Sequence, residues 1–132
     1  MASIRREISI AVPAEQAWSA LRDVGALHTR LVAGFVTDCR LEGDTRIVSF
    51  ANGMVARELI VDVSDAEHRV AWSSVGGRLT HHNASAQVFD DGADGSRVVW
   101  IADLLPNELA LAIAAMIEEG ILAMKATLER AS

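Results

Sequence analysis

The chain has 132 residues, 51% of them apolar, and a formal net charge of -6, which predicts one domain with a sizeable core over residues 1–132. The negative charge disfavours nucleic acid and anionic membranes as partners, because both require a basic protein surface. No apolar run is long enough for a membrane-spanning helix, and the lone Cys39 cannot form an internal disulfide. We therefore expect a cytoplasmic protein that does not insert into a membrane.

The first thirty residues predict a strand followed by two short helices. Apolar and polar side chains largely alternate from Ile4 to Val12, which is typical of a strand with one face on a core. Pro13 ends this strand and suits the first turn of a helix that continues to about Asp23. A second short helix is expected over residues 24–30.

Six further strands are expected in the middle of the chain, connected as a meander. Short alternating segments are separated by turn-forming groups such as Asn52-Gly53, in which glycine readily adopts a positive φ. The expected strands cover residues 35–41, 45–50, 54–63, 68–74, 79–90 and 96–104.

The last stretch predicts one long helix, from an N-cap at Asn107 to about Ala131. Its apolar side chains recur at spacings of three and four, which places them on one face. This face carries Leu109, Ile113, Met116, Ile117, Gly120, Met124 and Leu128. An antiparallel sheet needs an apolar layer over its inner face, and only this helix is long enough to supply it. We expect an α+β domain in which a curved sheet of about seven strands wraps around the helix.

Short motifs typical of one protein family are spread over nearly the whole chain. They are VPAEQAW at 12–18, GDTR at 43–46, NG at 52–53, REL at 57–59, VVW at 98–100 and LAMKATLE at 122–129. With these motifs the chain resembles the START/SRPBCC superfamily, which has the helix-grip fold, and in particular its polyketide cyclase/dehydrase-like branch. The resemblance implies a single domain of that fold. It also implies either binding of lipid-like or polyketide-like molecules or cyclase/dehydratase chemistry.

No general catalytic or metal-binding motif is present, and we expect neither a metal nor a cofactor. The pair His81-His82 is the only histidine cluster, and neighbours on a strand point to opposite faces, so the two cannot readily bind one metal. The alternation through Ala84 and Ala86 favours His82 on the apolar side, whereas Phe89 shares the side of His81. A neutral histidine in a pocket can act as an acid or base near pH 7, or serve as a structural hydrogen-bonding group.

Arg57 and Asp103 are the remaining candidates for acid/base chemistry. Arg57 shares its side of a strand with Val55 and Leu59, so it could lie near the interior and meet a ligand carboxylate or oxyanion there. Asp103 shares its side with Ile101 and could partner a histidine or arginine inside. The preferred interpretation is a surface salt bridge for Arg57 and an exposed strand-end carboxylate for Asp103.

Candidate ligand-binding residues lie on two strands and on the long helix. They are Trp72, Trp100, Leu109, Ile113, Met116, Ile117, Gly120 and Met124. The two tryptophans could wall a pocket or fill the core. Gly120 would leave space either for a ligand or for close packing against a strand.

Three functions remain open on these observations. The first is binding of a hydrophobic or aromatic small molecule in a cavity between sheet and helix. The second is a cyclase/dehydratase-type enzyme that uses His82 or His81, Arg57 and Asp103 as acid/base groups. The third is a protein-interaction module with a filled interior and an exposed apolar patch. A homodimer is compatible with each of them.

Overall fold

The computed structural model describes residues 2–131. In this range, the segments with alternating apolar and polar side chains form a seven-stranded antiparallel sheet. The strands are β1 (Ala2–Ile10), β2 (Val36–Glu42), β3 (Thr45–Phe50), β4 (Val55–Ser64), β5 (Arg69–Val75), β6 (His81–Asp90) and β7 (Ser96–Leu105). They lie in the order β1-β7-β6-β5-β4-β3-β2, so the first strand pairs with the last and the others follow the chain. The predicted helix-grip α+β fold is confirmed.

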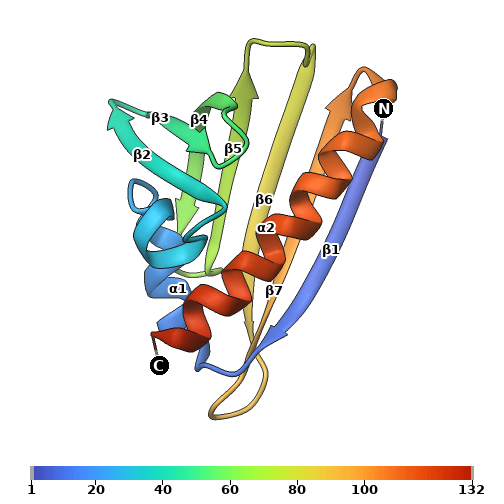
Figure 1. The fold of residues 1–132 in the computed structure, drawn as a ribbon. Coiled ribbons are helices and arrows are strands. Elements are labelled where there is room, and N and C mark those ends of the chain that lie inside the picture. Colours follow the sequence, from blue (N-terminus) through green and yellow to red (C-terminus); the bar gives the residue numbers. More distant parts are fainter. Residues whose placement is uncertain (1, 132) are drawn as a thin grey trace.

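Within residues 2–131, three short helical segments and one long helix complete the domain (Figure 1). The helix α1 (Ala14–Arg22) and the π-helical turn η1 (Leu27–Leu31) connect β1 to β2. The long helix α2 (Ala110–Arg130) follows a 3-10 turn, η2 (Asn107–Leu109). The predicted N-cap at Asn107 is wrong, because this residue starts the 3-10 turn and no side chain caps the beginning of α2.

Polar contacts hold the C-terminal half of α2 along β1. The ammonium of Lys125 donates a hydrogen bond to the carbonyl oxygen of Ser9 (2.8 Å), and the carboxylate of Glu129 accepts one from the backbone N–H of Ala11 (2.9 Å). In Figure 1 the helix accordingly lies beside β1 and β7, while β2, β3 and β4 curve away on the other side. The helix therefore packs closely on the part of the inner face formed by β1 and β7, and it leaves space over the part formed by β2, β3 and β4.

The short helix α1 is held against the turn between β4 and β5. The indole N–H of Trp18 and the guanidinium of Arg22 both donate to the carboxylate of Asp65, at 3.0 and 2.9 Å. The ring of Trp18 also stacks on that of His68, with 5.3 Å between centroids. These contacts lower the pKa of the Asp65 carboxyl and close one end of the domain.

Gly120 marks the closest approach between α2 and the sheet. A Cβ at this position would lie 2.9 Å from Cζ3 of Trp100 and 3.1 Å from Cε2 of Phe35. Both distances are shorter than normal carbon–carbon contacts. The glycine therefore makes room for two aromatic rings, which is the close-packing alternative of the two considered from the sequence.

Replacement of this glycine should be costly despite a better helix propensity. We expect Gly120→Leu to lower the free energy of unfolding by about 1–3 kcal/mol, because the added side chain must displace Trp100 and Phe35. Ala115→Leu is the matched control, since Ala115 is exposed on the same helix; its effect should stay within about 0.5 kcal/mol. Urea unfolding followed by circular dichroism measures both, and equal stabilities would contradict the assigned role of Gly120.

Candidate ligand-binding cavity

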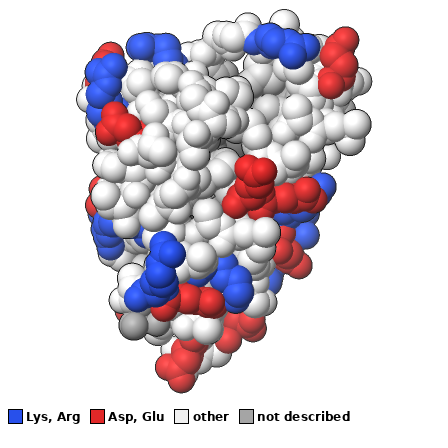
Figure 2. Space-filling view, in the orientation of Figure 1, with Lys and Arg blue, Asp and Glu red and all other residues white. Residues whose placement is uncertain are grey.

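A cavity of about 690 Å³ lies between the concave face of the sheet, η1 and α2. This volume is within the range of small-molecule sites in proteins. Figure 2 shows a hollow on this face, surrounded mostly by uncharged side chains. Aromatic rings from four positions contribute to the walls, namely Phe35, Phe50, Trp72 and Trp100. Their largely apolar surfaces favour an apolar or aromatic occupant.

Seven of the eight predicted ligand-binding residues line this cavity. They are Trp72, Trp100, Leu109, Ile113, Met116, Ile117 and Met124. The indoles of Trp72 and Trp100 meet edge to face, with 5.9 Å between centroids, and form one aromatic wall. Gly120 is the exception, because it contacts the back of the Trp100 ring and not the cavity. Helical spacing was sufficient to find the helix residues, since one face of α2 must turn toward the sheet.

A buried ion pair interrupts the apolar wall. The guanidinium of Arg46 donates from Nε and Nη2 to Oε1 of Glu58, at 3.0 and 2.6 Å. Its Nη1 donates to the carbonyl of Val24 (3.3 Å), and the guanidinium carbon lies 5.4 Å from the ring centroid of Trp72. The side chains of the pair are only 4% and 10% exposed. The positive charge is therefore neutralised, and each of the three guanidinium nitrogens donates one hydrogen bond inside the protein.

Arg57 lies on the surface next to an acidic side chain, the preferred interpretation of the sequence, and Glu58 takes the interior place. Arg57 borders the cavity, but its side chain is 56% exposed and its guanidinium lies 3.9 Å from the carboxylate of Glu42. Val55 and Leu59, which share its side of β4, are exposed as well, at 63% and 41%. Because these apolar side chains lie on the outer face of β4, they made the side of Arg57 resemble the inner face of the sheet. The signal that could have found Glu58 was its cross-strand pairing with Arg46 in a predicted hairpin.

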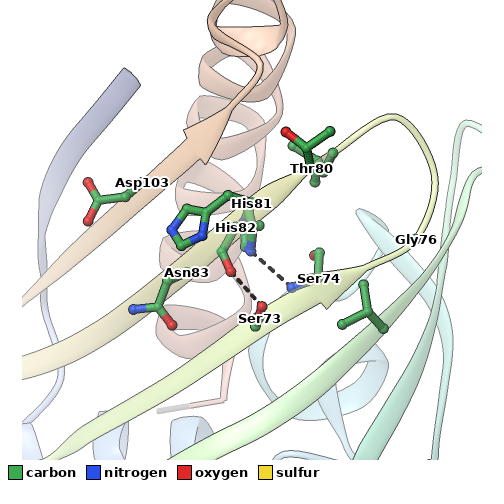
Figure 3. Close-up of a pocket in the computed structure, with 10 residues that line it drawn as sticks. Ser73, Ser74, Gly76, Thr80, His81, His82, Asn83 and Asp103 are labelled. Atoms are coloured by element: carbon green, nitrogen blue, oxygen red, sulfur yellow. Dashed lines mark hydrogen bonds between the residues drawn. The ribbon is translucent and has the colours of Figure 1, made fainter. Parts of the chain in front are cut away.

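Adjacent histidines on β6 occupy opposite faces of the sheet. His82 is buried and lines the cavity, whereas His81 is exposed on the outer face. Figure 3 shows His81 beside Asn83 and Asp103, with His82 hydrogen-bonded to β5. Strand alternation makes this separation unavoidable.

The acid/base groups considered from the sequence do not meet in one site. Asp103 accepts a hydrogen bond from the hydroxyl of Ser3 (2.6 Å) and borders an outer pocket with His81. Arg57 points toward solvent at the edge of the cavity. Of the four candidates, His82 is the one whose side chain is buried in the cavity wall.

The hydrogen bonding of His82 determines which chemistry its ring can offer. Its Nδ1 accepts a hydrogen bond from the backbone N–H of Ser74 (3.0 Å), so this nitrogen carries no proton. Burial lowers the pKa of the His82 imidazole, and the Coulombic effect of His81 lowers it further. The ring is therefore neutral at pH 7 with its proton on Nε2, and in this arrangement Nε2 is a hydrogen-bond donor.

Four polar side chains of the cavity form a row across consecutive strands. Arg46 on β3 is directly opposite Glu58 on β4, and Glu58 is directly opposite Ser74 on β5. The hydrogen bond from Ser74 to His82 continues the row to β6. We call these four residues the polar row. All of them line the cavity, whose other walls are largely apolar.

Neither a metal site nor a membrane span is found in the described part of the chain. Residues 2–131 contain no group of three or more His, Cys, Asp or Glu side chains placed to hold a metal ion. None of their helices combines the length and the apolar character needed to cross a membrane.

Comparison with known protein families shows which family the chain belongs to. The family described as "Polyketide cyclase / dehydrase and lipid transport" matches residues 1–129. The chain belongs to this family, within the START/SRPBCC superfamily. A comparison with curated proteins gives no match.

Solved structures share the fold of this family member at low sequence identity. XoxI from Bacillus cereus is 20% identical with a TM-score of 0.85, and the match covers 100% of this chain and 99% of that one. A START superfamily protein from Mycobacterium smegmatis is 14% identical with a TM-score of 0.81, covering 98% and 99%. Norcoclaurine synthase from Thalictrum flavum, solved in complex with dopamine and hydroxybenzaldehyde, is 16% identical with a TM-score of 0.73, covering 98% and 85%. These likenesses establish the helix-grip fold of the chain.

The protonation state assigned to His82 can be measured directly. Nuclear magnetic resonance titration should give this ring a pKa below 6.5, and nitrogen chemical shifts should place the neutral proton on Nε2. His81→Ala should raise the pKa of His82, because it removes the Coulombic contribution. A proton on Nδ1 would contradict the assignment.

The lowered pKa of His82 also makes stability depend on pH. The unfolded chain binds this proton more readily, so the contribution of His82 to the free energy of unfolding is complete well above pH 6.5 and decreases as the pH falls below that value.

Proposed function

We propose that this protein binds a hydrophobic or aromatic small molecule in the cavity between the sheet and α2. The observation that carries the proposal is the cavity of about 690 Å³ with its aromatic and aliphatic walls. Burial of apolar ligand surface in such a space contributes roughly 25 cal/mol per Å² before the costs of association. The family description, which includes lipid transport, supports the same class of ligand.

A binding role accounts for the site better than the acid/base set considered from the sequence. His81 and Asp103 lie on the outer face, and Arg57 is exposed. The remaining member, His82, is arranged as a donor because its Nδ1 is occupied by a backbone N–H. An interaction module is disfavoured because its interior should be filled, although exposed apolar side chains such as Val61 do lie on β4.

A cyclase/dehydratase-type enzyme is the second candidate, and one observation favours it. The cavity wall contains both a carboxylate, Glu58, and a donor, His82, and acid/base chemistry on a carbonyl compound uses such groups. Each ligand that binds should be incubated with the protein and analysed by liquid chromatography and mass spectrometry. Formation of a product that Glu58→Gln does not form would support the enzyme. Recovery of unchanged ligand throughout would support the binder.

Filling the cavity should weaken ligand binding without unfolding the protein. Native mass spectrometry and thermal-shift screening against fatty acids, sterols, flavonoids and polycyclic phenols should identify ligands. At 100 times its dissociation constant, a ligand of the native state adds about 2.7 kcal/mol of stability. The double variant Ile113→Trp, Met116→Trp should weaken binding at least about tenfold, because both side chains line the cavity.

The control for this experiment introduces two tryptophans on the exposed side of α2. Ala115→Trp, Leu122→Trp adds two indoles at positions that do not line the cavity, and it should bind like the original protein. The neutral dye Nile red provides a fluorescence readout for all three proteins. If both double variants bound the dye equally well, the cavity would not be the binding site.

A further inference from the structure

The polar row contains hydrogen-bonding groups that the protein itself leaves unused. Among residues 2–131, no group donates a hydrogen bond to Oε2 of Glu58, because both bonds from Arg46 end on Oε1. Likewise, Nε2 of His82 has no hydrogen-bond partner within that range, since its bonded ring nitrogen is Nδ1. The two residues are only 8% and 9% exposed and line the cavity. Neither atom is shut off from solvent, so each is free to form a hydrogen bond with a ligand or with water in the cavity.

The charge balance of the cavity restricts the ligand further. The buried cation, Arg46, is paired with Glu58 and also donates to the carbonyl of Val24, so it offers no free charge. Arg57 and Arg78 border the cavity but are exposed, and water screens their charges. A carboxylate inside would lose its hydration and lie near Glu58 without a counter-charge, which is strongly unfavourable.

The spacing of the strands separates the two unused groups. Glu58 on β4 and His82 on β6 have β5 between them, so their backbones lie two strand spacings, about 10 Å, apart. An aromatic scaffold with oxygens on different rings matches two contact groups that come from different strands, while its faces contact the Trp72 and Trp100 walls.

We infer that the ligand is a neutral, multi-ring aromatic compound with one hydroxyl that donates to Oε2 of Glu58 and one oxygen that accepts from Nε2–H of His82. Fatty acids and other carboxylates are excluded from the interior by the same arrangement. The inference rests on the proposed function, because it specifies the ligand of the same cavity.

A series of flavanones on one scaffold tests the inference with the unmodified protein. The probes are the monohydroxyflavanone isomers, flavanone itself, the corresponding hydroxyflavan without the carbonyl, and the flavanone carboxylate. Isothermal titration calorimetry at pH 7 should show the best monohydroxyflavanone binding about tenfold more tightly than flavanone or the hydroxyflavan, since each loses one hydrogen bond. The carboxylate should bind most weakly of the series.

The outcomes separate this inference from the proposed function. If all probes bound equally, or if the carboxylate bound most tightly, the inference would be overturned while the binding function stood. If no probe bound and Nile red also failed to bind, both would be overturned.

Two variants assign the polar contacts to their residues. His82→Ala should bind the monohydroxyflavanone and the corresponding hydroxyflavan equally, whereas His81→Ala, on the opposite face, should retain the preference for the carbonyl compound. The readout is the ratio of two affinities, and a general loss of stability would not change this ratio. An unchanged ratio in His82→Ala would overturn the role of His82.

Glu58→Gln should reverse the discrimination against anions. Without the carboxylate, the guanidinium of Arg46 becomes an unpaired buried cation, and the flavanone carboxylate should then bind at least about tenfold more tightly than it binds the original protein. Glu119→Gln removes one negative charge from an exposed position and is the matched control. An equal affinity of both variants for the carboxylate would contradict the inference. If Glu58→Gln does not fold, the flavanone series and the affinity ratio of His82→Ala still test the inferred ligand class.

Discussion

An α-helix is about 10 Å wide, whereas seven strands at about 4.8 Å span roughly three times that width. One helix therefore cannot cover the inner face of this sheet. In this protein α2 is held along β1 by Lys125 and Glu129, and Gly120 allows it to approach Trp100. The uncovered strands curve around the remaining space, which η1 and α1 close at the other side (Figure 1). The cavity is thus a geometric consequence of where the helix lies.

The polar row adds chemical specificity to this apolar space. Burying an ion pair such as Arg46–Glu58 costs desolvation energy that only good geometry and further hydrogen bonds offset. Here Val24 and the ring of Trp72 complete the surroundings of the guanidinium. The pair therefore holds β3 and β4 together and leaves one carboxylate oxygen facing the cavity.

The histidine pair on β6 shows how strongly strand geometry divides neighbouring residues. His82 is held by a backbone N–H of β5, which directs its remaining ring nitrogen as a donor. His81 lies with Asp103 on the outer face, next to a different pocket. His82 also borders this outer pocket, but the large cavity is lined by His82 and not by His81, and no catalytic cluster of the four sequence candidates results.

Local periodicity was sufficient to predict the elements, because period two and period 3.6 leave different apolar patterns. The seven strands, the long helix and seven residues of the cavity wall follow from it, and the family motifs indicated the same fold. Alternation alone does not determine which face of a strand is buried when both faces carry apolar residues. On β4 the outward Val55 and Leu59 left an inner position open for Arg57, whereas the ion pair with Arg46 places Glu58 there. That choice depends on contacts between strands, which only the tertiary structure decides.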